Sequence, residues 1–374
     1  MIKRMIYLLK KPFLSIKGMN KIKKEISESQ IGHSKIIGWE NGLPVSSLFF
    51  PAENSDVSSY AFTRFYNSLR FHRSWPFMCN LAITQKCNFN CKHCSAAGQD
   101  GKELSTEEWK DIIRQCIELG VIVIIFTGGE PLQREDISEI IKSVDKKKAI
   151  PIIFTNGYFL KDKIKELKKS GLNRIFISID YADSNLHDIH RQMKGSYKKA
   201  IESLEIAKKE GMLVGISTFS SPSRMKDGTL EKIFRLGNLL KVNEIMVFNE
   251  MPVGRNIMNY KLGSMEKSYS DEFSEFININ QQRYKKMGIY AYQKIKSMGA
   301  ANCSAGTNMF KVSFNGDIWP CEFCNIPIGN LKKNSLYELW PKLRKLAITK
   351  QNESYGCWVL EDYKKKFNEN KSED

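Results

Sequence analysis

The chain has 374 residues, enough for one large domain and a smaller one, and 42% of them are hydrophobic, so a substantial core can form. No run of eighteen apolar residues predicts a membrane-spanning helix, and the short apolar run near the N-terminus does not resemble an export signal. The net charge of +17 would suit nucleic acid, but the lysines are spread along the whole chain without a nucleic-acid motif, so we expect no such partner.

The chain has nine cysteines, whose number helps to predict the cellular compartment of the protein. Without an export signal, they favour a cytoplasmic location and metal ligation over disulfide bonds.

The first 75 residues form a basic extension that we expect to be mostly helical. Residues 1–24 carry eight basic side chains and no acidic one, with apolar residues near helical spacing. Such a segment can lie on an anionic membrane surface. It can also pack on the main domain as a helix with a solvated lysine face, which is the alternative that we favour. A further helix is expected over residues 58–71.

Between residues 76 and 256, apolar strands alternate with amphipathic helices. The expected strands are the runs at 77–84, 121–127, 151–156, 173–180, 213–220 and 243–250. Helical crossovers between successive strands imply parallel pairing and right-handed connections. The sequence therefore predicts an α/β fold, a partial (β/α)6 TIM-like barrel with its active site at the C-terminal ends of the strands. A doubly wound open sheet is the competing architecture, and periodicity alone does not separate the two.

Three cysteines follow the first expected strand in one short loop: Cys87, Cys91 and Cys94. Several thiols on a tight loop are typical of iron–sulfur clusters, whereas zinc sites most often use two short cysteine pairs. Three thiols on a four-iron cube leave one iron open, and an open metal position is where chemistry happens. A zinc site short of one ligand, or a fortuitous group of cysteines, is the alternative reading.

The second expected strand ends at Thr127 and is followed by Gly128, Gly129, Glu130 and Pro131. Two glycines let a backbone approach a ligand closely, and the carboxylate of the glutamate can accept an ammonium group. By itself the segment could also be a tight turn.

The fourth expected strand ends with Ser178 and Asp180, and Arg191 follows in the next segment. A guanidinium is suited to a bidentate grip on a carboxylate. The alternatives are that Arg191 caps a loop at the surface and that Asp180 stabilises the local loop.

Together, the Cys-x3-Cys-x2-Cys loop, the Gly-Gly-Glu-Pro segment and the Ser-x-Asp…His-Asp-x-x-Arg stretch resemble the radical S-adenosylmethionine (SAM) superfamily. The resemblance implies that Cys87, Cys91 and Cys94 hold a [4Fe–4S] cluster that binds SAM. It assigns the other SAM contacts to Gly128, Gly129, Glu130, Ser178, Asp180 and Arg191. Reductive cleavage of SAM would give methionine and a 5′-deoxyadenosyl radical, which removes hydrogen from a substrate.

Residues 257–300 are expected to form a polar helical bridge to a second cysteine set in residues 301–360. This set consists of Cys303, Cys321, Cys324 and Cys357. Asn315-Gly316-Asp317, flanked by alternating apolar residues, predicts a β-hairpin inside it, and a helix follows near 336–343. A structural zinc hairpin would also explain these cysteines. Residues 361–374 are a charged tail.

The spacing Cys303-x12-Gly316-x4-Cys321 resembles the SPASM/twitch extension of radical SAM enzymes. The resemblance implies a single auxiliary [4Fe–4S] cluster, with Cys324 as its uncertain ligand. It also implies a reducing partner such as flavodoxin or ferredoxin, and an auxiliary cluster that accepts an electron from the substrate radical.

The resemblance does not identify the substrate. A peptide or protein that is oxidatively modified is the reading we favour, and a small molecule or tetrapyrrole is the alternative. Two hypotheses from other functional classes remain. The protein could be a non-enzymatic iron–sulfur electron carrier or sensor, or a nucleic-acid-binding protein stabilised by zinc. No catalytic acid or base is predicted.

Overall fold

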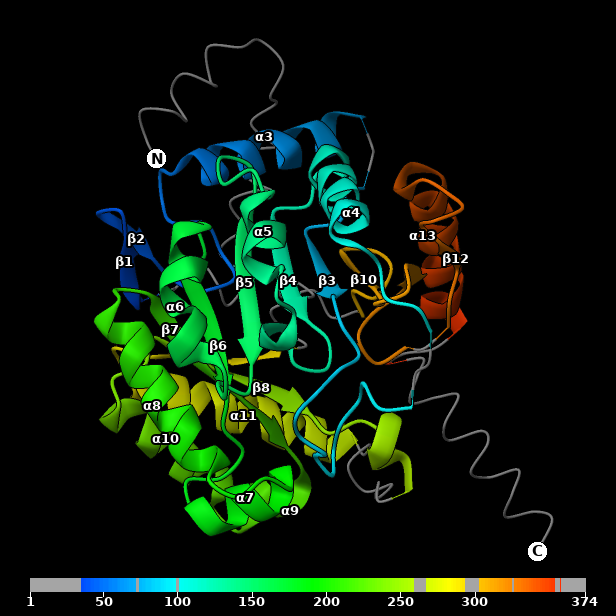
Figure 1. The fold of residues 1–374 in the computed structure, drawn as a ribbon. Helices are drawn as coiled ribbons and strands as arrows, with labels where there is room; N and C mark the ends of the chain where they lie inside the picture. The colour runs from blue at the N-terminus through cyan, green and yellow to red at the C-terminus, as the bar shows by residue number, and fades with distance from the viewer. Residues whose placement is uncertain are drawn as a thin grey trace, which may run out of the picture.

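The computed structural model describes residues 35–71, 74–98, 101–258, 267–292, 303–324, 326–353 and Cys357 (Figure 1). The expectations for residues 1–24 and for the tail at 361–374 lie outside this part of the chain. Within it, no helix is both long and apolar enough to cross a membrane.

A ten-stranded sheet organises the molecule, in the order β12-β11-β10-β3-β4-β5-β6-β7-β8-β9. The six expected strands are β3 (Met78–Ala82), β4 (Val123–Thr127), β5 (Ile150–Thr155), β6 (Arg174–Ser178), β7 (Leu213–Ser220) and β8 (Glu244–Asn249). Each pairs in parallel with its successor in the chain. A doubly wound sheet reverses its strand order part-way, whereas here the order runs straight through. The prediction of a partial (β/α)6 barrel is confirmed.

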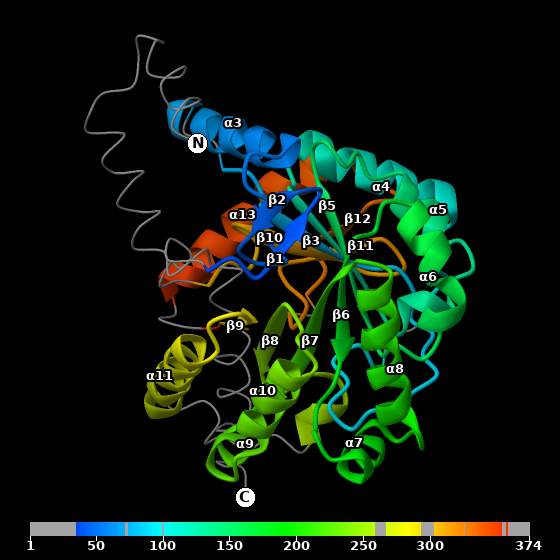
Figure 2. The ribbon, with the colours of Figure 1, turned by 90° about the vertical axis from the view of Figure 1, so that its left-hand side faces the viewer.

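Helices cover the outer side of the curved sheet (Figure 2). The helices of the described residues, in chain order, are α3 (Asp56–Phe71), α4 (Thr106–Leu119), α5 (Ile137–Lys142), α6 (Leu160–Lys169), α7 (Ser184–Arg191), α8 (Ser196–Lys209), α9 (Pro222–Lys226), α10 (Thr229–Leu239), α11 (Lys267–Arg283) and α13 (Leu336–Glu353). Two short 3-10 turns, η1 (Pro131–Gln133) and η2 (Gly254–Met258), lie among them. At the start of helix α4, Ser105 and Glu108 form a capping box, and Gly120 ends the helix in the left-handed conformation.

Residues 35–50 close the N-terminal end of the barrel, a role that the sequence did not reveal. Here β1 (Gly38–Glu40) and β2 (Leu43–Val45) form an antiparallel pair. The fully buried guanidinium of Arg174 donates to the carbonyls of Leu48 (2.7 Å) and Phe50 (2.6 Å). At the start of β8, the carboxylate of Glu244 accepts from the Leu48 N–H at 2.8 Å. Because both anchors stand on the first residue of a strand, this segment seals the end opposite to the expected active site.

The C-terminal elements extend the same sheet at both edges. The expected hairpin is present: β10 (Met309–Val312) pairs antiparallel with β11 (Asp317–Trp319), which pairs with β12 (Gly329–Asn330). Strand β10 also pairs in parallel with β3, so the hairpin is continuous with the barrel sheet. At the other edge, β9 (Gly288–Ala291) pairs with β8 in a region expected to be helical throughout. Of that expected bridge, α11 is the helical part.

Candidate active site

One cavity opens at the C-terminal ends of the strands. It is lined by Cys87, Cys91, Cys94, Gly128, Gly129, Glu130, Ser178, Asp180 and Arg191, which are the residues predicted for the first cluster and for SAM. Asn80, Tyr292, Glu322 and Phe323 also line it, and the last two lie between Cys321 and Cys324 of the second cysteine set. The fold therefore brings the residues of the first motifs and two neighbours of the second cysteine set to a single cavity.

The two glycines after β4 allow close contact with the segment that leads into the cysteine loop. The N–H of Gly129 donates to the carbonyl of Thr84, and the N–H of Glu130 donates to the carbonyl of Lys86, both at 2.7 Å. A Cβ on Gly128 would lie 2.3 Å from the carbonyl oxygen of Thr84, and one on Gly129 would lie 2.2 Å from that of Lys86. Any larger residue at either position would therefore push the cysteine segment away.

The carboxylate of Glu130 is buried and fully engaged by the protein. It accepts from the Thr155 hydroxyl at 2.6 Å, the Asn156 N–H at 2.8 Å and the Leu132 N–H at 3.0 Å. Burial raises the pKa of this carboxyl, while these three donors oppose the rise. Glu130 thus fixes the end of β5 against the turn after β4. Its contact with a SAM ammonium group stays a prediction.

Asp180 and Arg191 form a buried ion pair at the edge of the cavity. Nε of Arg191 lies 2.6 Å from Oδ2 of Asp180, and α7 carries the arginine on its last turn. Burial alone would raise the pKa of the Asp180 carboxyl, but the guanidinium of Arg191 holds it well below its usual range. The alternative reading, in which Arg191 caps a loop at the surface, is therefore wrong, because the residue is only 8% exposed. Ser178 lies nearby, with its hydroxyl 3.2 Å from that of Ser217.

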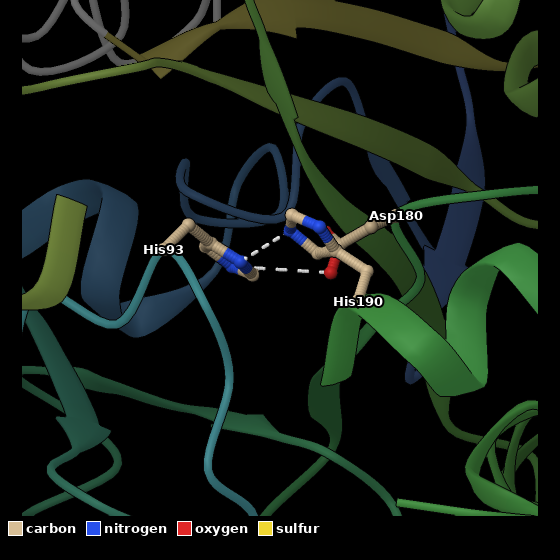
Figure 3. A group of neighbouring side chains, drawn as sticks. All are labelled: His93, Asp180 and His190. Atoms are coloured by element: carbon tan, nitrogen blue, oxygen red, sulfur yellow. Dashed lines mark hydrogen bonds and ion pairs between the residues drawn. The ribbon is translucent and has the colours of Figure 1, made fainter. Parts of the chain in front are cut away.

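Two histidines to which the sequence analysis gave no role lie on this side of the cavity: His93 lines it, and His190 on α7 contacts His93 (Figure 3). Nδ1 of His93 lies 2.6 Å from Nε2 of His190, and Nε2 of His93 lies 3.8 Å from Oδ2 of Asp180. The ring of Phe219 stacks on both imidazoles. Burial lowers the pKa of His93 to about 3 and that of His190 to about 4, so both rings are neutral at pH 7. In the sequence, each histidine directly precedes a predicted site residue: His93 precedes Cys94, and His190 precedes Arg191. This adjacency could have indicated that both lie near the site.

The segment after β8 packs directly on the cysteine loop. The N–H of Arg255 donates to the Cys94 carbonyl at 3.0 Å, and its guanidinium donates to the Cys91 carbonyl at 3.1 Å. On the other side of the loop, the amide of Asn156 donates to the side-chain oxygen of Asn88 at 2.9 Å. The loop that carries the three thiols is thus held by Arg255, which follows β8, and by Asn156, which follows β5.

The second cysteine set lies beside β10 and β11. Cys321 and Cys324 are buried and face each other in an antiparallel bridge, and Cys303 packs against the same apolar cluster. The N–H of Gly306 donates to the carbonyl of Pro320 at 3.0 Å, which joins the Cys303 segment to the Cys321 segment. Cys357 is half-buried. The remaining cysteines, Cys79 and Cys116, are fully buried in the core.

Comparison with known families identifies both halves of this site. Residues 81–240 match the profile of the radical SAM superfamily, and residues 303–358 match that of an iron–sulfur cluster-binding domain, SPASM. The chain belongs to the radical SAM superfamily. It is therefore a radical SAM enzyme with a SPASM domain, and its cofactors are [4Fe–4S] clusters and SAM.

Individual proteins support this placement. The chain is 28% identical over 281 residues to the AdoMet-dependent heme synthase of Methanosarcina barkeri. The alignment covers 69% of this chain and 80% of that protein. It is 24% identical over 258 residues to the PqqA peptide cyclase of Bradyrhizobium diazoefficiens, covering 66% of each. The structure of Streptococcus suis SuiB bound to the precursor peptide SuiA has a similar fold, with a TM-score of 0.59 at 17% identity over 86% of this chain and 77% of that one.

The donors present suit the cofactors of the superfamily. Three free cysteines from one loop line the cavity, and burial raises the pKa of the Cys91 thiol. A bound metal would favour the thiolate form of this sulfur. Bound SAM supplies the radical chemistry of the superfamily, and the chain supplies ligands, orientation and shelter from water.

Proposed function

We propose that this radical SAM enzyme oxidatively modifies a peptide or protein. The observation that carries the proposal is the shared cavity. Residues of the cysteine loop and of the strand ends form one part of its wall, and Glu322 and Phe323, beside Cys321 of the SPASM domain, form another. A substrate between them would lie near the site of hydrogen removal and near an electron acceptor.

In this proposal, Cys87, Cys91 and Cys94 hold the cluster that binds SAM. Gly128, Gly129 and Glu130 present backbone to the amino group of SAM, and Ser178, Asp180 and Arg191 orient its carboxylate or ribose. Asp180 contacts only Nε of Arg191, so the terminal nitrogens of that guanidinium remain to grip a ligand. Cys303, Cys321, Cys324 and Cys357 hold the auxiliary cluster. An external one-electron donor such as flavodoxin or ferredoxin supplies the reducing electron.

The charges of the cavity favour a substrate rich in hydrogen-bond donors. Among the described lining residues, Arg191 is the one Lys or Arg side chain, and Asp180 already neutralises it. Glu250 and Glu322 add carboxylates to the same wall. Carboxylates accept hydrogen bonds from peptide N–H groups or amines, whereas they repel other carboxylates. The PqqA peptide cyclase and the peptide-bound SuiB are consistent with this class of substrate.

A tetrapyrrole is the second candidate, and the relative with 28% identity favours it, since that protein is an AdoMet-dependent heme synthase. Porphyrins of this kind carry propionate groups, which would meet Glu250 and Glu322. The acidic lining therefore makes the tetrapyrrole the weaker candidate.

Metal analysis and SAM cleavage test the assignment of the site. Two cubes require about eight irons per anaerobically reconstituted chain, and Cys91→Ala should reduce this to about four. With dithionite and SAM, the wild-type protein should form 5′-deoxyadenosine, and Cys91→Ala should form none. Wild-type yield of deoxyadenosine from Cys91→Ala would contradict the assignment.

Two kinds of probe test the substrate class. Peptides encoded by short reading frames beside the gene form one arm, and Fe-coproporphyrin III forms the other. We expect a peptide to raise the rate of deoxyadenosine formation and to lose hydrogen atoms, as seen by mass spectrometry, while the porphyrin leaves the rate at its background. Stimulation by the porphyrin with no modified peptide would support the second candidate instead.

A further inference from the structure

Lys311 carries a buried positive charge on the cavity side of the sheet. It lies in the middle of β10, opposite Asn80 on β3 and opposite Trp319 on β11. Side chains at paired positions of neighbouring strands point to the same face of a sheet. Because Asn80 lines the cavity, Lys311 lies on the face that holds the active site. The residue is only 4% exposed.

The protein offers this ammonium group little compensation. Nζ lies 4.1 Å from the centroid of the Trp319 ring, which is a cation–π contact. Within the described residues, Lys311 makes no ion pair with a carboxylate. The Oε2 of Glu322 instead accepts from the amide of Asn80 at 3.1 Å. Burial lowers the pKa of Lys311 to about 8, and Glu322 and the thiols of Cys321 and Cys94 oppose that effect.

A buried, unpaired ammonium is costly unless an anion lies close to it. Among the charged groups that act on Lys311, Glu322 has the largest effect, Cys321 the next and Cys94 the smallest. Cys321 also follows Trp319 by two residues, so the ring under the ammonium and the thiol belong to the same short segment. A thiolate-ligated cluster at Cys321 would add a further anion beside Lys311, in addition to Glu322.

We propose that Lys311 raises the reduction potential of the auxiliary cluster and so makes it a better electron acceptor. A cluster becomes more negative by one charge when it gains an electron, and a nearby positive charge stabilises that reduced form. The inference rests on the proposed function, because it requires the second cysteine set to hold a cluster. Lys311 acts here through its charge, without contact with the substrate.

Redox titration followed by EPR spectroscopy tests this role in the full-length, reconstituted protein. Added SAM should perturb the signal of the cluster at Cys87–Cys94 only, so the unperturbed signal reports on the auxiliary cluster. Lys311→Met keeps the apolar stem and removes the charge. We expect the equilibrium constant for reduction of its auxiliary cluster to be about tenfold smaller than in the wild type. For one electron this lowers the reduction potential by about 59 mV. Lys311→Arg is the matched control that keeps the charge, and its potential should equal that of the wild type.

Each other outcome has a defined meaning. An unchanged auxiliary potential in Lys311→Met would overturn the role of the lysine and leave the proposed function intact. A shift confined to the SAM-perturbed signal would also overturn it. Absence of a second cluster signal in the wild type would contradict the proposed ligand set, and the inference with it. Lys311→Gln serves as a second neutral variant, and loss of the cluster from both would assign the lysine to cluster assembly instead.

Discussion

Nε of Arg191 lies 2.6 Å from Oδ2 of Asp180, and this pair joins the segment after β6 to the last turn of α7 at the wall of the cavity. Both side chains are buried, so neither charge can be solvated if its partner is removed. The pair should therefore contribute to the stability of the barrel, in addition to the ligand contacts proposed for it.

Asp180→Asn should lower the free energy of unfolding by about 3 kcal/mol, because it leaves a buried guanidinium without its counter-charge. The double variant Asp180→Asn/Arg191→Met should lose less than the sum of the two single variants. Urea unfolding followed by circular dichroism under anaerobic conditions measures all four proteins. Strict additivity would show that the two charges do not stabilise each other.

Gly129→Ala should reduce deoxyadenosine formation by about a hundredfold, because the new Cβ would displace the backbone at Lys86 and with it the cysteine loop. Gly42→Ala is the matched control. Its φ of +75° imposes backbone strain, but no atom lies within 4 Å of the new Cβ, and the β1–β2 turn is remote from the cavity. The control should lose some stability and keep its activity. Equal activity of the two variants would contradict the steric explanation.

Cys321→Ala should retain a larger fraction of the wild-type rate of SAM cleavage than of the wild-type rate of product formation. The reason is that the three thiols proposed to hold the SAM-binding cluster are unchanged. The measurement is the ratio of modified substrate to deoxyadenosine, by chromatography and mass spectrometry. Cys116→Ala, which alters a fully buried core cysteine, should leave that ratio unchanged. If Cys321→Ala abolishes deoxyadenosine formation altogether, the second set is not auxiliary to the first.

The stability of the N-terminal segment should depend on pH through Glu244. Burial raises the pKa of this carboxyl from 4.5 to about 7, so the folded protein holds the proton more tightly than the unfolded chain. The free energy of unfolding should therefore fall as pH rises from about 4.5 to about 7, by at most about 3 kcal/mol, and should not change through this group at higher pH.

Glu244→Gln removes that titration and keeps an acceptor for the Leu48 N–H. Urea unfolding between about pH 5 and pH 8 should show a steeper decline for the wild type than for this variant. Glu53→Gln, at an exposed carboxylate nearby, is the control and should follow the wild type. Parallel curves for the wild type and Glu244→Gln would show that the group does not titrate in this range.

The barrel and the first cysteine loop were predictable because their signals are local. Continuous apolar runs marked each parallel strand, and the motif residues followed strand ends, which a parallel sheet must gather at one edge. Ser105 and Gly120 likewise marked the two ends of α4. These features depend on neighbours within a few residues of the chain.

Features that depend on distant partners could not be predicted. Arg174 and Glu244 look like ordinary strand residues, and only the folded chain shows that they hold residues 35–50 in place. Strand β9 is four residues long and follows a helix, so its pairing with β8 had no local signal. The contact between His93 and His190 joins positions 97 residues apart.

The parallel pairing of β10 with β3 fixes more than the position of a hairpin. The first cysteine loop continues from β3, and the Cys321 segment continues from β11, the partner of β10. Main-chain hydrogen bonds of one sheet therefore fix how far apart the two cysteine segments begin. If both cysteine sets hold clusters, as proposed, the rigid sheet would keep the two clusters at a constant separation from one turnover to the next.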